Sequence, residues 1–260
     1  MRRTTDRLHQ VSPGSQTSVC VAWSPDDIDG RAYDVVGLAN ASDLLYVMSY
    51  DTRSQIFDRC IASANSPASR ARYGLQRYLD LGISPKKLIL GTPYVFSPLS
   101  LLASIIMKHT NTYRWYGYDY PCQESLETIK ASSYCTIDLV PFRGVNCSDA
   151  TGRERTFADI QNVQSNDPSA SEVRFDTSTD TPFFHYVDSK TSKVHQIWFD
   201  DANSSSLKYN VALDLGVRGV GPFTYSDLDY SNERALTQAT AMWDALASYK
   251  KSAEAAANFF

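Results

Sequence analysis

The feature that most constrains the fold is a set of short apolar runs, each about as long as one β-strand. They span residues 18–23, 44–50, 87–93 and 217–223. The first three are nearly continuous, whereas a strand with one face in water alternates apolar and polar side chains. Strands buried on both faces have this pattern, which is typical of parallel sheets. The runs therefore predict a parallel sheet that is covered by helices.

Helical patterns occur between and after these runs. One predicted helix spans 69–81 and ends at Gly82, and a second spans 232–250, with a tail at 253–260 that we expect to fray. We find no other strand–helix units, and the alternation of the two element types indicates an α/β architecture. The apolar faces are predicted to carry Leu75, Tyr78 and Leu79 in the first helix and Leu236, Ala239, Trp243 and Leu246 in the second.

The pattern changes in the middle of the chain. Turn residues, clustered cysteines and alternating segments predict a small α+β subdomain over 115–200, inserted into a parallel part formed by 1–93 and 201–260. Residues 94–114 fit neither part, because they are apolar without a clear period, and a loop of this length is uncommon. Two interpretations of this segment remain open: a loop that contains a helix, or translated non-coding sequence from a gene-model error.

Composition excludes several classes of protein. The net charge of −4 provides no basic surface for nucleic acid. No run of 18 uncharged apolar residues indicates a membrane span, and the N-terminus lacks the apolar core of a signal peptide. Four histidines and no Cys-x-x-Cys make a metal site or other cofactor unexpected. An aromatic content of 12%, including 16 tyrosines, suits a packed core and also suits stacking against neutral sugars.

The cysteines and glycosylation motifs favour an oxidising compartment. Five cysteines leave at least one unpaired, and Cys20 lies within a predicted strand, where we expect a buried free thiol. Disulfide candidates are Cys122, Cys135 and Cys147. The Asn-x-Ser acceptors are Asn40, Asn146 and Asn203.

Seven short runs carry a resemblance to a known family. Their order and spacing, from about residue 4 to 250 with a break at 94–114, resemble glycoside hydrolase family 18. The runs are Val21-Ala22-Trp23-Ser24-Pro25, Val47-Met48-Ser49-Tyr50-Asp51, Pro85-Lys86-Lys87-Leu88, Trp115-Tyr116-Gly117-Tyr118-Asp119-Tyr120, Val140-Pro141-Phe142-Arg143-Gly144, His195-Gln196-Ile197-Trp198 and Leu228-Asp229-Tyr230-Ser231.

The resemblance implies a partial (β/α)₈ TIM barrel. The four predicted strands would be its fifth to eighth, with the α+β insertion after the seventh strand. Family members of this kind act on N-acetylglucosamine linkages, in chitobiose cores of glycoproteins or in chitin oligosaccharides, and are lysosomal or secreted. They use substrate-assisted retaining hydrolysis, in which the acetamido oxygen of the sugar attacks its own anomeric carbon.

Site residues follow from the same resemblance. The Tyr50 hydroxyl would hold the acetamido carbonyl, and Asp51 would accept from sugar hydroxyls or set the local electrostatics. The other implied substrate-binding residues are Trp23, Trp115, Tyr116 and Phe223. Phe223 stands where the family usually has Trp. Pro222 before it is unfavourable inside a central strand, because it cannot donate a ladder hydrogen bond.

One part of the family pattern is missing. The Asp-x-x-Asp-x-Asp-x-Glu motif that supplies the general acid does not occur, and Asp26-Asp27-Ile28-Asp29 has Arg31 where the glutamate would stand. We therefore expect this chain to be inactive alone and the full-length protein to be the enzyme. The alternatives are a non-catalytic chitin- or glycan-binding protein and a product of a faulty gene model. Open barrel edges predict poor solubility and self-association.

Overall fold

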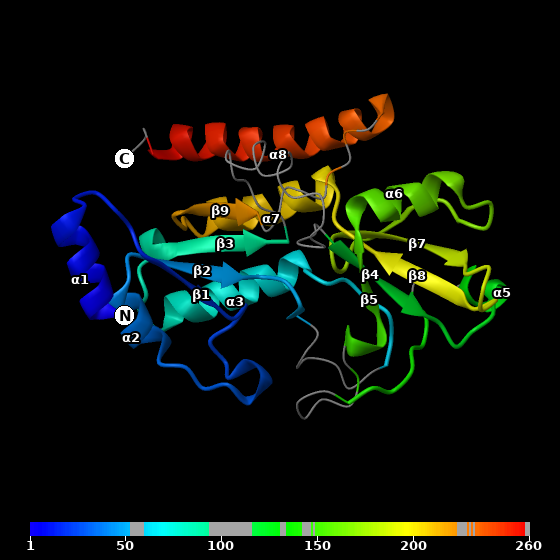
Figure 1. Ribbon diagram of the computed structural model, residues 1–260, viewed down its shortest axis with the longest axis horizontal. Helices are drawn as coiled ribbons and strands as arrows, with labels where there is room; N and C mark the ends of the chain where they lie inside the picture. The colour runs from blue at the N-terminus through cyan, green and yellow to red at the C-terminus, as the bar shows by residue number, and fades with distance from the viewer. Residues whose placement is uncertain are drawn as a thin grey trace.

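The computed structural model contains two sheets side by side, with helices packed around them (Figure 1). It describes residues 1–52, 60–93, 116–130, 134–141, 147, 149–222, 228, 230 and 232–257. The segment 94–114, whose interpretation was left open, lies outside the described residues. No helix in the described ranges is both long enough and apolar enough to cross a bilayer.

The first sheet is parallel and has the strand order β1-β2-β3-β9. Each strand lies within one of the four apolar runs, so the predicted parallel sheet is confirmed. In register, Cys20 of β1 pairs with Tyr46 of β2, which pairs with Ile89 of β3. Over the described residues this sheet is not closed, and β1 and β9 are its edges. The strands are β1 (Ser18–Val21), β2 (Leu44–Met48), β3 (Leu88–Thr92) and β9 (Gly219–Pro222).

Helices cover one face of the parallel sheet. Leu45, Leu88 and Leu90 point to that face and are fully buried among side chains of α3 and α7. Fully burying one such side chain stabilises the fold by about 1.5–3 kcal/mol. The helices of this part are α1 (Arg2–Val11), α2 (Val35–Ala41), α3 (Ala68–Asp80), α7 (Ala202–Asp214) and α8 (Glu233–Ala257), and three-residue 3₁₀ turns occur at η1 (Ile28–Gly30), η3 (Pro85–Lys87) and η4 (Asp149–Thr151).

Two helices of this part were not predicted from the sequence: α2 lies between β1 and β2, and α7 lies between β8 of the second sheet and β9. Helix α7 was missed because polar residues occupy its buried face. Lys208 is 1% exposed and pairs with the Asp200 carboxylate, and Ser204 forms a capping box with Asp201. Such residues hide the apolar period on which the prediction depended.

Helix α8 lies along α7 and extends over α6 of the second sheet (Figure 1). It runs to Ala257, so residues 253–257 are helical rather than frayed. Leu236 does not belong to its packed face, because its side chain is 51% exposed. The buried positions of α8 are Ala235, Ala239, Met242 and Ala245. Three of them are alanines, which let α8 pack closely against its neighbouring helices.

The second sheet is antiparallel and has the order β5-β4-β8-β7-β6. Its residues lie within the range given to the α+β insertion, whose exact limits stay a prediction. One face carries Tyr118, Phe183 and Trp198, and the other is covered by α6 and α8. The elements are β4 (Tyr116–Pro121), α5 (Leu126–Lys130), β5 (Arg153–Thr156), α6 (Phe157–Asn166), β6 (Arg174–Asp176), β7 (Thr181–Val187) and β8 (Val194–Trp198).

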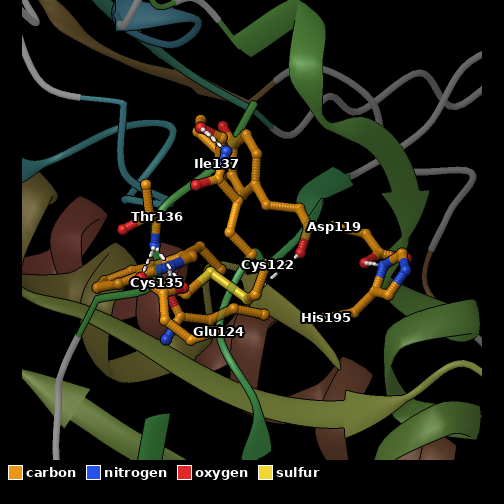
Figure 2. Close-up of a disulfide and its surroundings, with 11 residues drawn as sticks. Asp119, Cys122, Glu124, Cys135, Thr136, Ile137 and His195 are labelled. Atoms are coloured by element: carbon orange, nitrogen blue, oxygen red, sulfur yellow. Dashed lines mark hydrogen bonds and ion pairs between the residues drawn. A yellow bond between two sulfur atoms is a disulfide. The ribbon is translucent and has the colours of Figure 1, made fainter. Parts of the chain in front are cut away.

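Two disulfides connect parts of the fold. Cys122 pairs with Cys135, next to the Glu124 carboxylate that accepts from the Thr136 amide at 2.9 and 3.0 Å (Figure 2). Cys60, which the sequence analysis did not single out, pairs with Cys147 across 87 residues. Cys20 is the free cysteine and is exposed, contrary to the expected buried thiol, because its side chain points away from the helix-covered face on which Val21 is buried.

Pro222 is less unfavourable than the sequence suggested. It is the last residue of β9, where it pairs with Thr92, and β9 is an edge of the described sheet. A proline is tolerated at such a position because an edge strand needs no donor on its outer side.

Candidate active site

The candidate site begins where β2 ends. The Ser49 amide continues the sheet pairing by donating to the Gly91 carbonyl at 3.0 Å. Tyr50 follows and is 8% exposed. Asp51 then adopts a φ of 52°, in the left-handed region that non-glycine residues rarely occupy. The strained turn places a tyrosine and a carboxylate at the carboxyl end of the parallel sheet, and open α/β sheets bind ligands at the carboxyl ends of their strands.

A buried segment between β2 and α3, residues 62–67, holds this turn. The Asn65 side-chain oxygen accepts from the Asp51 amide at 2.8 Å, and the Asn65 carbonyl accepts from the Thr52 amide at 3.2 Å. The Ser66 hydroxyl also donates to the Ser49 carbonyl. These bonds fix the backbone on both sides of Asp51.

The second sheet contributes a wall. The Tyr118 hydroxyl donates to Asp51 Oδ1 at 3.4 Å, and the Tyr118 ring stacks on Tyr120 with centroids 5.7 Å apart. Tyr50 and these two rings belong to one buried cluster, which also contains Trp198. The site is therefore formed jointly by the two sheets.

Electrostatics keep Tyr50 protonated. Burial raises the pKa of Tyr50, and the neighbouring Asp51 charge and Cys20 raise it further. The hydroxyl is consequently a neutral hydrogen-bond donor beside a carboxylate at any ordinary pH. A neutral donor and a carboxylate side by side can bind an uncharged amide or hydroxyl group.

Tyr46 connects strands of the parallel sheet next to this site. Its ring lies over Gly91 and Gly221, where a side chain on either glycine would overlap the ring. Its hydroxyl donates to the Gly221 carbonyl at 2.7 Å, so Tyr46 links β2 to β9 across β3. Burial is the largest of the causes that raise the pKa of Tyr46, and the side chain stays a donor.

The other predicted site residues lie away from Asp51 or have no described side chain. Trp23 is 4% exposed and packs against α3, with its ring 6.2 Å from that of Tyr73, and no described contact joins it to Asp51. Tyr116 opens β4, but only its backbone is described. Trp115, Phe223 and Asn146 lie outside the described residues, while Asn40 and Asn203 are exposed on helices α2 and α7.

Two residues of the site escaped the sequence analysis. Tyr118 could have been found from strand alternation, because residues 116, 118 and 120 share one face of β4. Asn65 carries no such signal, since it lies in a stretch without a period, and its role depends on a contact across 14 residues.

A second polar centre lies on the opposite face of the antiparallel sheet. Asp119 is fully buried, and its Oδ1 accepts from His195 Nδ1 at 2.7 Å (Figure 2). Its Oδ2 accepts from the Tyr186 hydroxyl at 2.8 Å and from Arg155 and Arg153 at 2.9 and 3.1 Å. Burial alone would raise the pKa of Asp119, but the hydrogen bonds and charges of these partners, first among them His195, hold it below the ordinary value.

Asp26 belongs to the acidic run that partly resembles the missing Asp-x-x-Asp-x-Asp-x-Glu motif, and its carboxylate also has hydrogen-bond partners. It accepts from Ser24, Tyr73 and Arg77. Partial burial raises the pKa of Asp26, but these bonds outweigh it and lower the pKa overall. A carboxyl group that stays ionised in this way is a poor general acid.

Comparison with known proteins identifies the class. The model of the family described as "Glycosyl hydrolases family 18" matches residues 2–227, and the chain belongs to this family. The chain is 38% identical over 247 residues to the protein named "Di-N-acetylchitobiase" from Rattus norvegicus. That match covers 95% of this chain but 60% of the relative, so the chain spans well under two thirds of the relative's length.

Solved structures show the same fold. A chitinase from Chromobacterium violaceum matches with a TM-score of 0.62 at 19% identity, covering 95% of this chain and 59% of the other. A family 18 chitinase from Cycas revoluta in complex with (GlcNAc)3 matches with a TM-score of 0.58 at 17% identity, covering 93% and 60%.

Proposed function

We propose that this chain forms the acetamide-holding side of a sugar site that binds N-acetylglucosamine oligosaccharides. One observation carries the proposal: a buried Tyr50 hydroxyl lies beside the carboxylate of Asp51, whose backbone is strained, at the place where the two sheets meet. The relative's name and the (GlcNAc)3 complex of the Cycas revoluta chitinase support this class of ligand. In this assignment the four parallel strands are the fifth to eighth of a (β/α)₈ barrel, with the antiparallel sheet as the insertion after the seventh.

Tyr50 and Asp51 would act in different ways. The Tyr50 hydroxyl donates to the acetamido carbonyl and turns it toward the anomeric carbon. The Asp51 carboxylate accepts from a sugar hydroxyl and opposes the positive charge that develops on the oxazolinium ring. These are the steps of substrate-assisted retaining hydrolysis that positioning and electrostatics can supply.

Protonation of the leaving oxygen is a separate requirement. No Asp-x-x-Asp-x-Asp-x-Glu motif occurs in these 260 residues. General acid catalysis contributes roughly 10²–10⁴-fold in rate. We therefore propose that the whole protein is a lysosomal or secreted glycosidase of the chitobiase type, in which another part supplies the acid, and that this chain alone binds sugar with activity near background.

The test is binding of N-acetylglucosamine trimer, measured by calorimetry or tryptophan fluorescence, with a chromogenic chitobioside as the activity assay. We expect binding without measurable turnover, and Tyr50→Phe should weaken binding about tenfold, as expected for one lost hydrogen bond. Absence of binding by the unchanged chain would refute the proposal, and turnover by the purified chain would refute the claim of a missing acid.

The second candidate is a non-catalytic binder of chitin or glycans. The absent acid motif favours it, because binding needs only the residues described here. The sequence of the native transcript on its 5′ side separates the two candidates: an in-frame motif there supports the enzyme, and continued absence of the motif supports the binder.

A further inference from the structure

Asn65 combines three properties that a purely structural residue does not need. It is 5% exposed, it lies directly beside the candidate site, and its side-chain nitrogen Nδ2 has no hydrogen-bond partner. The large majority of buried side-chain polar atoms in native proteins are paired, and an exception requires an explanation. A ligand that brings an acceptor is one such explanation.

The orientation of the Asn65 amide is fixed by its neighbour. The Asp51 backbone N–H is a donor, so the atom 2.8 Å from it must be the oxygen Oδ1. A flipped amide would set two donors against each other and would leave the oxygen unpaired instead. Nδ2 therefore carries two N–H groups without an acceptor, and rotation of the side chain cannot relieve this.

The same side chain stabilises the strained turn. Asp51 occupies the left-handed region, and such residues persist where surrounding contacts over-determine them. The side-chain oxygen of Asn65 holds the Asp51 amide, and its carbonyl accepts from both the amide and the hydroxyl of Thr52. Asn65 thus bonds to both residues of the turn that follows Tyr50.

We propose that Asn65 is a positioning residue for Asp51 and that its free N–H groups bind an uncharged acceptor oxygen of the ligand, either the acetamido carbonyl or a ring hydroxyl. The proposal deepens the function proposed above and rests on it. The ligand atom is uncharged because the Asp51 carboxylate next to it would repel an anion. Asn65 would add a second neutral donor to the hydroxyl of Tyr50.

Three variants separate the two roles. Asn65→Asp keeps an acceptor for the Asp51 amide but removes the donor, whereas Asn65→Ala removes both. Asn162→Asp is the matched control, because it makes the same exchange of amide for carboxylate at an exposed position on α6, away from the candidate site, and leaves Asn65 intact. Melting curves establish which variants fold, and if Asn65→Ala does not fold, Asn65→Asp still tests the donor.

Two measurements at pH 7 decide the proposal. Hydrogen exchange of the Asp51 amide should accelerate at least about tenfold in Asn65→Ala and stay slow in Asn65→Asp and Asn162→Asp, since a tenfold change corresponds to one modest hydrogen bond. Affinity for the N-acetylglucosamine trimer should fall by about tenfold in Asn65→Asp and Asn65→Ala but not in Asn162→Asp. Deacetylated glucosamine trimer identifies the acceptor: an Asn65→Asp effect that vanishes with this ligand assigns the acetamido carbonyl, and one that persists assigns a hydroxyl.

Contrary results are equally specific. Unchanged Asp51 exchange in a folded Asn65→Ala variant would overturn the positioning role. Unchanged affinity in Asn65→Asp would overturn the donor role while leaving the proposed function intact. If the unchanged chain binds no trimer, the donor role and the proposed function fall together, and the exchange experiment still judges the positioning role.

Discussion

Asp51 and Asp119 are aspartates in two regions of one molecule, and their surroundings are opposite. Asp119, in the antiparallel sheet, is fully buried and accepts from two arginines, a histidine and a tyrosine. Asp51, at the end of the parallel sheet, is only partly buried, has strained backbone and lies beside an amide without an acceptor. A satisfied network stabilises a fold, whereas an incomplete one leaves hydrogen-bonding capacity for a ligand.

The largest effect should come from breaking the satisfied network. Asp119→Asn leaves Arg155 and His195 facing a neutral amide and should cost about 3–5 kcal/mol of unfolding free energy, as for a broken buried ion pair. Chemical denaturation measures this loss. Asp51→Asn is the matched substitution and should change stability by less than about 1 kcal/mol while weakening sugar binding. If Asp119→Asn and Asp51→Asn destabilise the fold equally, the proposed difference between the two aspartates is wrong.

The Asp119 effect should depend on pH with a definite sign. Its pKa is lowered in the folded state, so its contribution is fully present above the ordinary carboxyl pKa of about 4. The contribution is lost as pH falls through the lowered pKa. The stability difference between the unchanged chain and Asp119→Asn should therefore be flat at neutral pH and shrink in acid; a difference that grows in acid would contradict the assignment.

The two disulfides should differ in how much they stabilise the fold, by less than the effect expected for Asp119→Asn. Cys60–Cys147 closes a span of 87 residues and joins the loop after β2 to the insertion, while Cys122–Cys135 closes 13. In the chain-entropy model the longer loop contributes about 1–2 kcal/mol more. Comparing paired Cys→Ser variants by thermal unfolding tests this, and greater destabilisation from the loss of Cys122–Cys135 would contradict it.

The most local of these effects concerns two glycines of β9. Gly221→Ala places a methyl group against the Tyr46 ring and should destabilise by about 1–3 kcal/mol through overpacking. Gly219→Ala, on the same strand, meets open space and should be neutral or slightly stabilising. Equal midpoints for the two variants in urea would show that Tyr46 does not brace this strand.

Sequence reasoning found what depends on local pattern. The four parallel strands followed from apolar runs, since buried strands leave a continuous signature. The Tyr50–Asp51 pair came from the family resemblance, and its role stays a prediction. Helix α7 did not follow, because Lys208 and Ser204 occupy its buried face. Asn65 and Cys60 did not follow either, since their partners lie 14 and 87 residues away and pairing at such separations is decided by the fold.

The origin of Tyr118 has an evolutionary consequence. This side chain reaches Asp51 from a sheet that has its own strands, its own disulfide and its own aromatic cluster. Insertions or substitutions there can change the surroundings of Asp51 while the backbone turn at residues 49–52 is inherited unchanged. Evolution can therefore alter what lies against this turn without rebuilding the parallel sheet that positions it.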